Sequence, residues 1–347
     1  MPPAISPQKV VGGLAVRKGN QQHDVEEHIT MPLLQIQARL HPPRIDLTGK
    51  VAIVTGANAG IGLETVRQLL FLNAATVVLA VRSIEKGEAA RSLLLADESI
   101  RLVKKAPDIR VMKLDMADYQ SAWEFANRIK VALPALHILI LNAAVANLPW
   151  SKTSSGHDQI TQVNYFSNVL LLLLLELLPL LEASARRTGE PARVTRWWSS
   201  LDDPKSYGWF MRYPDSKLLA AAFVREFCRY QDARTVVVND VCPGMVDTGI
   251  AHNAPGYLRR PMAALTRVTA RTPEQGAWAV MHAAVIAGPG SHGQFLVDQS
   301  EVSSYGALQS TEGQRLRMQL WKETAAEMVQ QGVVLPPFME TFLEDAA

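Results

Sequence analysis

A tyrosine and a lysine in the motif YPDSK are placed to carry out acid–base chemistry. Tyr213 and Lys217 stand four residues apart at the start of a helix expected over 214–230, so they share one face of it. Pro214 falls in the first turn, where its missing N–H costs nothing. A lysine ammonium beside a phenol lowers the pKa of the phenol from about 10, which gives an acid active near neutral pH. Taken alone, a surface Tyr–Lys pair on an amphipathic helix explains the motif better.

Two further polar residues could act with this pair. Ser200 lies 13 residues before Tyr213, at the end of an expected strand. A hydroxyl there can hydrogen-bond a substrate carbonyl oxygen and stabilise developing negative charge, although it could also cap a turn. Asn164 falls inside an expected helix, where asparagine is disfavoured. Burial in a functional hydrogen-bond network would explain it, and so would simple exposure.

The stretch from Val51 to Gly62, VAIVTGANAGIG, is suited to binding a phosphate. Its apolar run predicts a strand that is buried on both faces, as in a parallel sheet. Glycines at 56, 60 and 62 let the backbone turn and approach a ligand, and the N-terminus of the following helix favours an anion. The spacing Gly-x-x-x-Gly-x-Gly matches neither the common dinucleotide fingerprint nor a Walker loop, so a structural loop stays open as an alternative.

Strands and helices alternate from Gly49 onward, which predicts βαβ units and right-handed crossovers. Strands are expected at 51–55, 76–81, 110–114, 136–141, 192–198, 235–241 and 294–297. Helices are expected at 61–72, 84–96, 118–132, 158–185, 214–230 and 273–287. We therefore expect an α/β fold with a doubly wound, seven-stranded parallel sheet flanked by helices, as one domain over 47–304. Residues 1–46 are expected to form a partly flexible extension, and 305–347 a helical tail that docks on the domain.

Composition narrows the class of protein. The chain of 347 residues is 48% hydrophobic and 20% charged, with a formal net charge of +2, so neither nucleic acid nor an acidic membrane surface is expected as a partner. Cys228 and Cys242 have no metal or redox spacing, and His23 and His28 miss the spacing that aligns two ligands on a helix. We therefore expect no metal site and, with no secretory signal visible, a cytoplasmic location.

One stretch is apolar enough to suggest a membrane. Residues 169–181, VLLLLLLELLPLL, number 13 and include Glu176 and Pro179, whereas a span needs about 20 residues. No membrane span is expected. An interior helix or a homodimer interface through the 158–185 helix is the better explanation.

Several motifs together resemble a known family. They are TGANAGIG at 55–62, LNAA at 141–144, Asn164, Ser200, YPDSK at 213–217 and CPGMVDT at 242–248. In this order they resemble the short-chain dehydrogenase/reductase family over about residues 47–300. VLAVRS, SSL and GQFLVDQSE look most like its retinol dehydrogenase-like branch, a pattern that many fungal reductases share. Ala144, where the family usually has glycine, and the unusual strand sequence VTRWWSS depart from that pattern.

The resemblance implies a Rossmann-type fold and a role for each matching residue. Tyr213 would be the general acid/base, Lys217 would tune it and hold the nicotinamide ribose, and Ser200 would orient the carbonyl. Asn164 would anchor a water that relays protons. Cofactor contacts are implied for Gly56, Asn58, Gly60, Ile61, Gly62, Asp115, Met116, Asn142, Ala143, Tyr213, Lys217, Pro243, Gly244, Val246 and Thr248. Ser199 is a weaker candidate than Ser200.

The end of the second strand predicts which cofactor is used. An acidic residue there would bind the ribose 2′-OH of NAD, but residues 80–83, AVRS, offer none. Arg82 can instead hydrogen-bond a 2′-phosphate, so we expect NADP(H).

These observations predict an NADPH-dependent carbonyl reductase that can run in reverse as an alcohol dehydrogenase. Loops at 201–212 and 249–271 should form the substrate walls, and their apolar residues suggest an apolar small-molecule substrate such as a secondary metabolite. These residues are Trp209, Phe210, Tyr257, Leu258 and Met262. A dehydratase, isomerase or cyclase on the same fold, or a non-catalytic NADP(H)-binding protein, stays open.

Overall fold

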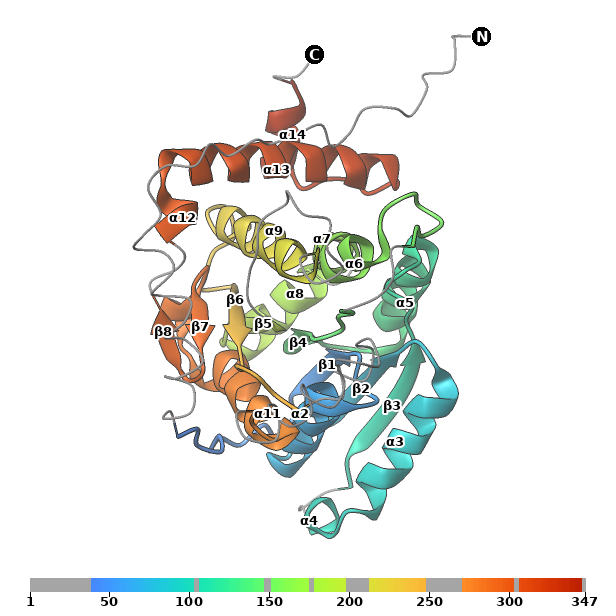
Figure 1. The fold of residues 1–347 in the computed structure, drawn as a ribbon. Helices are drawn as coiled ribbons and strands as arrows, with labels where there is room; N and C mark the ends of the chain where they lie inside the picture. Colours follow the sequence, from blue (N-terminus) through green and yellow to red (C-terminus); the bar gives the residue numbers. More distant parts are fainter. Residues whose placement is uncertain are drawn as a thin grey trace, which may run out of the picture. The chain divides into compact units, whose positions relative to one another are not determined.

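The sheet of this protein is parallel over all but its last strand. The computed structural model describes residues 39–102, 106–146, 151–174, 178–197, 212–247, 270–302 and 306–344. Within them, eight strands are ordered β3-β2-β1-β4-β5-β6-β7-β8, and only β7 and β8 pair antiparallel (Figure 1). The strands are β1 Val51–Thr55, β2 Thr76–Val81, β3 Asp108–Lys113, β4 Ile138–Leu141, β5 Ala192–Trp197, β6 Val236–Cys242, β7 Phe295–Val297 and β8 Ser300–Val302. The predicted class, a doubly wound α/β fold, is confirmed.

The predicted count of seven strands is not confirmed, because the sheet gains β8 at its edge. Two residues, Asp298 and Gln299, connect β7 to β8, and Asp298 adopts a left-handed φ of 62°. The Gln299 side chain exchanges two hydrogen bonds with the backbone of His41, at 2.9 and 2.6 Å. A strand of three residues is too short to show a periodic pattern in the sequence.

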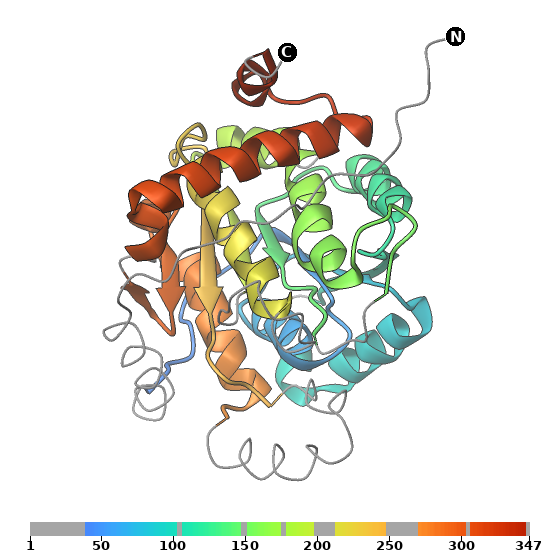
Figure 2. The same cartoon turned by 45° about the horizontal axis from the view of Figure 1, so that its top comes forward.

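Helices cover both faces of the sheet. They are α2 Gly60–Phe71, α3 Ile84–Ala96, α4 Glu98–Arg101, α5 Tyr119–Ala132, α6 Gln159–Thr161, α7 Ser167–Leu173, α8 Leu178–Thr188, α9 Arg212–Phe227, α11 Pro273–Met281, α12 Gly306–Gln309, α13 Thr311–Gln330 and α14 Pro337–Glu344, with the π-helical turns η1 Gln162–Phe166 and η3 His282–Ile286 and the 3-10 turn η4 Pro289–Ser291. Helices α2 and α11 lie on one face, while α5, α7 and α9 lie on the other (Figure 1). Helix α13 crosses the outside of that second layer (Figure 2).

Strand β1 shows why the sheet is buried on both sides. All five of its residues are buried. Val51 and Ile53 belong to the core on the α5–α9 side, whereas Ala52 and Val54 belong to the core on the α2–α11 side. Successive side chains of a strand point to opposite faces, so an uninterrupted apolar run is what a doubly covered strand requires.

The long helix predicted over 158–185 is interrupted. Helix α7 ends at Leu173, Leu174 has a non-helical ψ of 108°, and α8 begins at Leu178. Pro179 explains the interruption, since it has no N–H to donate and its ring clashes with the carbonyl four residues earlier, so it is tolerated only in a first turn. Every residue of α7 is buried within the chain itself.

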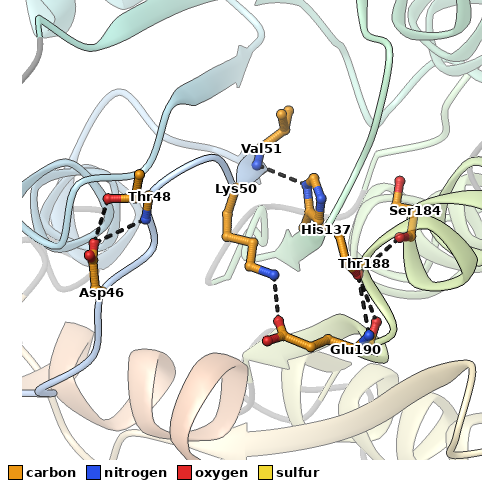
Figure 3. Close-up of polar contacts among 8 residues, drawn as sticks. All are labelled: Asp46, Thr48, Lys50, Val51, His137, Ser184, Thr188 and Glu190. Atoms are coloured by element: carbon orange, nitrogen blue, oxygen red, sulfur yellow. Dashed lines mark hydrogen bonds and ion pairs between the residues drawn. The ribbon is translucent and has the colours of Figure 1, made fainter.

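Polar contacts tie together the amino ends of β1, β4 and β5 (Figure 3). The Lys50 ammonium lies 2.5 Å from the Glu190 carboxylate, and the Val51 N–H donates to Nδ1 of His137 at 3.0 Å. These residues immediately precede or begin the strands, at the end of the sheet opposite the strands' carboxyl ends. We infer that this cluster contributes to the stability of the fold.

His137 should make that stability depend on pH. Burial, followed by the charges of Lys50 and Arg187, lowers the pKa of His137 below its ordinary 6.5. The folded state therefore prefers the neutral ring, whose stabilisation is complete above pH 6.5 and is lost as the pH falls from there toward the lowered folded pKa. We expect the free energy of unfolding, measured with urea, to decrease over that window.

A matched pair of variants isolates the histidine. In His137→Asn, Oδ1 of the amide can accept from the Val51 N–H without titrating, so the pH-dependent loss should shrink. His41→Asn, at an exposed histidine whose contacts to Gln299 use only its backbone, should keep the wild-type slope. Equal slopes in all three proteins would contradict the assignment.

Candidate active site

A pocket of about 260 Å³ lies at the carboxyl ends of β1 to β4. Here the strand order reverses, because β1 has β2 on one side and β4 on the other, and open α/β sheets bind ligands at such a point. Its lining brings together many residues that the sequence predicts for the cofactor: Gly56, Asn58, Gly60, Ile61, Gly62, Arg82, Asp115, Met116, Asn142 and Ala143.

The glycine turn is packed too closely for other residues. Gly56 and Gly60 have φ values of +66° and +56°, which L side chains rarely adopt. A Cβ on Gly62 would lie 2.5 Å from Nδ2 of Asn142 and 2.6 Å from the carbonyl oxygen of Gly56. The spacing of these glycines therefore reflects turn geometry and the close approach of the turn to the end of β4.

Asn142 joins the turn to β4. Its buried amide donates to the carbonyl oxygens of Thr55 and Gly56, at 2.8 and 3.4 Å. The Thr55 hydroxyl in turn accepts from the N–H of Ala143 at 2.9 Å. These bonds fix the carboxyl ends of β1 and β4 relative to each other and shape the pocket floor.

The start of α2 is open to a ligand. Its N-cap residue is Ala59, which lines the pocket, and no side chain makes a capping hydrogen bond there. The first N–H groups of a helix carry partial positive charge and have no intrahelical partner, so they suit a phosphate. Because the glycine turn leads directly into this helix end, the geometry fits a nucleotide pyrophosphate.

Arg82 and Asp115 follow β2 and β3 and both line the pocket. Arg82 is exposed at the end of β2, and only its backbone carbonyl makes a described bond, with Nζ of Lys113 at 2.5 Å. Asp115 uses Oδ1 to accept the N–H of Ala117 at 3.0 Å, while the Ser121 hydroxyl accepts from the Asp115 N–H at 2.9 Å. The guanidinium group can therefore meet an anionic group at the pocket rim.

Asn164 is fully buried in the π-helical turn η1. Its amide pairs with both backbone groups of Val145: Oδ1 accepts the N–H and Nδ2 donates to the carbonyl, each at 2.9 Å. Nδ2 also lies 3.1 Å from the hydroxyl of Ser216 in α9. Asn168 donates to the carbonyls of Val163 and Asn164, at 2.9 and 3.1 Å, which satisfies acceptors where the helix widens.

Tyr213 and Lys217 occupy the first two turns of α9, one turn apart. Ser216, which contacts Asn164, directly precedes Lys217. The predicted residues Ser199, Ser200 and Thr248 lie outside the described residues. So do 201–211 and 249–269, which are most of the predicted substrate walls at 201–212 and 249–271. The structure thus places the Asn164 turn beside the helix that carries the YPDSK motif.

Arg271 holds the segment that follows β6. The Arg271 guanidinium donates to the carbonyl of Pro243 at 3.0 Å and forms an ion pair with Asp298, and the Arg271 N–H donates to the carbonyl of Met245 at 2.8 Å. Gly244 has a φ of +77°. Pro243, Gly244 and Val246 do not line the pocket described above, although Val246 packs close to Gly276.

Sequence reasoning missed several apolar residues that line the pocket: Ala80, Leu114, Ala144, Val145 and Val163. The prediction was based on polar side chains at the ends of strands. An apolar residue that lines a pocket cannot be told from a core residue by its type alone. Val145 and Val163 could have been found as neighbours of LNAA and of Asn164.

Other kinds of site receive no support from the part of the chain that the structure describes. No cluster of three His, Cys, Asp or Glu side chains there could hold a metal ion. Of the helices in the same ranges, none is both long and apolar enough to cross a membrane.

Known proteins resemble this chain over most of its length. Residues 50–256 match the family described as short chain dehydrogenase. The chain is 41% identical over 320 residues to short chain dehydrogenase yanD of Aspergillus niger, which covers 86% of this chain and 96% of the relative. It is 40% identical over 318 residues to short-chain dehydrogenase/reductase tropG of Talaromyces stipitatus, covering 85% and 95%.

A solved structure agrees with these sequence relatives. The RhlG/NADP active-site complex of Pseudomonas aeruginosa superposes with a TM-score of 0.57 at 25% identity, covering 75% of this chain and 99% of that one. It supports the fold described above.

Proposed function

Because this chain belongs to the short-chain dehydrogenase family, we propose that it is an NADPH-dependent carbonyl reductase that can also oxidise the corresponding alcohol. The observation that carries the proposal is the pocket at the switch point of the sheet, where the glycine turn, the uncapped start of α2 and Arg82 converge. An oxidoreductase function follows from the family; the cofactor preference, the direction and the residue roles are the proposal.

The proposed mechanism assigns each catalytic step to a residue of this chain. NADPH supplies the hydride when it is bound. The Ser200 hydroxyl hydrogen-bonds the substrate carbonyl and polarises it, and the Tyr213 phenol gives its proton to the carbonyl oxygen. The Lys217 ammonium favours the ionised phenol, so that Tyr213 can act near neutral pH. Asn164 holds the turn beside α9 in place, and we assign it the water that replenishes the proton.

Arg82 supports the preference for NADPH. It lies exposed at the end of β2, where an NAD-specific site would carry a carboxylate for the ribose 2′-OH. Guanidinium groups bind phosphate oxygens through charge-assisted, often bidentate, hydrogen bonds. The RhlG structure was determined as an NADP complex, which supports the same choice here.

We propose an apolar small molecule, such as a secondary metabolite, as the substrate. The support is compositional: the sequence of 201–212 and 249–271 contains Trp209, Phe210, Tyr257, Leu258 and Met262. Apolar and aromatic side chains dominate small-molecule pockets.

The test is a panel of carbonyl compounds with the purified chain and NADPH, read by the loss of NADPH absorbance and by product analysis. We expect one NADPH consumed per alcohol formed, with apolar ketones and aldehydes turned over best. Turnover of small polar carbonyls alone would contradict the proposed substrate class. Product formed without NADPH consumption would replace reduction by dehydration, isomerisation or cyclisation, and tight NADPH binding without any turnover would favour a binding protein.

A further inference from the structure

Helix α13 contacts the segment that carries Asn164 through two polar groups. The first is Thr324, which is fully buried and whose hydroxyl lies 2.6 Å from the hydroxyl of Tyr165. Tyr165 is also fully buried and is the next residue after Asn164 in the turn η1. A hydrogen bond between two buried hydroxyls is costly to break on one side only, because the remaining group is left desolvated without a partner. This contact therefore holds the turn against α13.

The second contact is the carboxylate of Glu327, one turn further along α13. Its Oε1 accepts from the hydroxyl of Tyr119 and the amide of Gln331, both at 3.1 Å, and lies 3.0 Å from Nε2 of His157. His157 precedes α6, the helix that leads into η1, and its ring lies 4.4 Å from that of Phe166. Glu327 thus fixes the start of the same segment.

Glu327 remains ionised in this setting. Burial acts to raise the pKa of Glu327, but the nearby ring of His157 and the hydroxyl of Tyr119 outweigh it, so the pKa lies below its usual value. The ionised carboxylate accepts from Tyr119 of α5 and lies 3.0 Å from the ring nitrogen of His157, so it links α13 to α5 and to the segment before α6.

Apolar contacts attach α13 to the helix of the YPDSK motif. The Trp321 ring is fully buried and stacks on Phe223 of α9, with centroids 5.1 Å apart and planes inclined by 25°. Trp321, Thr324 and Glu327 are spaced by three residues and so lie along one side of α13. One face of α13 therefore contacts both α9 and the Asn164 segment, as its course across that layer also suggests (Figure 2).

Asn164 connects these contacts to the pocket. Its amide holds the backbone of Val145, which lines the pocket, and contacts Ser216 in α9. Val163, on the other side of Asn164, lines the pocket as well. A displacement of η1 would therefore move both the pocket wall and the partner of α9.

We infer that helix α13 helps to position the active site, with Thr324 and Glu327 as positioning residues that hold Asn164 in register with α9. This inference rests on the proposed function for its effect on catalysis. Neither residue lines the pocket; Thr324 acts through Tyr165, and Glu327 acts through His157. A shift of about 1 Å in a catalytic group can lower the rate about 100-fold. The contacts of Thr324 and Glu327 can therefore affect kcat although neither residue lies in the pocket.

The experiment uses the full chain with Thr324→Val, Glu327→Gln and the control Glu323→Gln, which lies on the exposed side of α13 and pairs with Gln319. We expect kcat to fall about 10-fold in each of the first two. The dissociation constant of NADPH should rise by less than kcat falls, because the glycine turn and Arg82 lie on other elements of the pocket. Thr324→Ser, which keeps the hydroxyl, should restore kcat. Glu323→Gln should match the wild type.

Two further readouts separate positioning from general destabilisation. Hydrogen exchange of the cofactor-free protein should speed up at residues 159–168 in Thr324→Val and Glu327→Gln while the strands stay protected. In an Asn164→Ala background, Thr324→Val should lower kcat little further, because both changes remove the same constraint. The exchange experiment needs no turnover, so it tests these contacts even if the carbonyl panel refutes the proposed reaction. Unchanged exchange at 159–168, or fully additive losses of kcat, would overturn the inference.

Discussion

Replacing Tyr213 by phenylalanine is expected to lower kcat by about 100- to 10,000-fold, the range that a general acid contributes. The change removes only the phenolic hydroxyl, so the ring and the start of α9 should be retained. NADPH should still bind with an unchanged dissociation constant, because the glycine turn and Arg82 lie on other elements of the pocket. Single-turnover rates and a fluorescence titration with NADPH measure the two quantities separately.

Tyr230 provides the matched control for this substitution. It follows the same helix, its ring stacks on Trp321 and Phe338, and phenylalanine can keep both stacks. Tyr230→Phe should therefore leave kcat within about twofold of the wild type, because this exposed side chain does not line the pocket. If Tyr213→Phe turned over as fast as Tyr230→Phe, the assignment of the proton donor would be wrong, whichever substrate is used.

The parts of this molecule that local physics controls could be predicted from the sequence. Consecutive apolar residues such as Val51 to Val54 predict a doubly covered strand wherever the chain places it, and a glycine turn before a helix predicts a phosphate site. The break after Leu173 was also readable in principle, because Pro179 cannot lie in the interior of a helix. The prediction of one helix over 158–185 gave the leucine run more weight than the proline.

What could not be predicted depends on partners that are distant in the sequence. Asn164 attracts notice as an asparagine within a helix, but its partners Val145 and Ser216 are 19 and 52 residues away. The pair Tyr165 and Thr324 is separated by 159 residues. Neither residue type nor spacing reveals such contacts, because the three-dimensional fold alone decides which buried hydroxyls meet. The same holds for β8, whose three residues gain strand geometry only by pairing with β7.

The cofactor site also shows how far a local pattern can lead. The residues after β1 to β4 that the sequence singled out lie around one pocket, because the carboxyl ends of parallel strands meet at one edge of the sheet. Residues after β6 follow the same rule but do not line that pocket, and the turn that begins at Pro243 is held by Arg271. The pocket therefore supports the proposed nucleotide site but does not bear on the proposal that the residues after β6 lie beside the nicotinamide.

Arg82→Asp is expected to reverse the cofactor preference. The substitution removes the guanidinium group that we assign to the 2′-phosphate and introduces a carboxylate that repels it but can accept the ribose 2′-OH of NADH. Hydrogen bonds to charged groups contribute about 1.5–3 kcal/mol, or roughly 10- to 150-fold, and the added repulsion increases the effect. We therefore expect the ratio of kcat/KM for NADPH to that for NADH to fall by at least about 100-fold.

The same charge change elsewhere provides the control for Arg82→Asp. Arg101, at the exposed end of α4, does not line the pocket, so Arg101→Asp alters the net charge equally without touching the site. It should leave the cofactor ratio unchanged, because exposed charges beyond about 10 Å are screened at ordinary salt. A wild-type chain that prefers NADH, or a ratio that moves equally in both variants, would show that Arg82 does not read the 2′-phosphate. In that case Asp115, which follows β3 and lines the same pocket, would be the next residue to test.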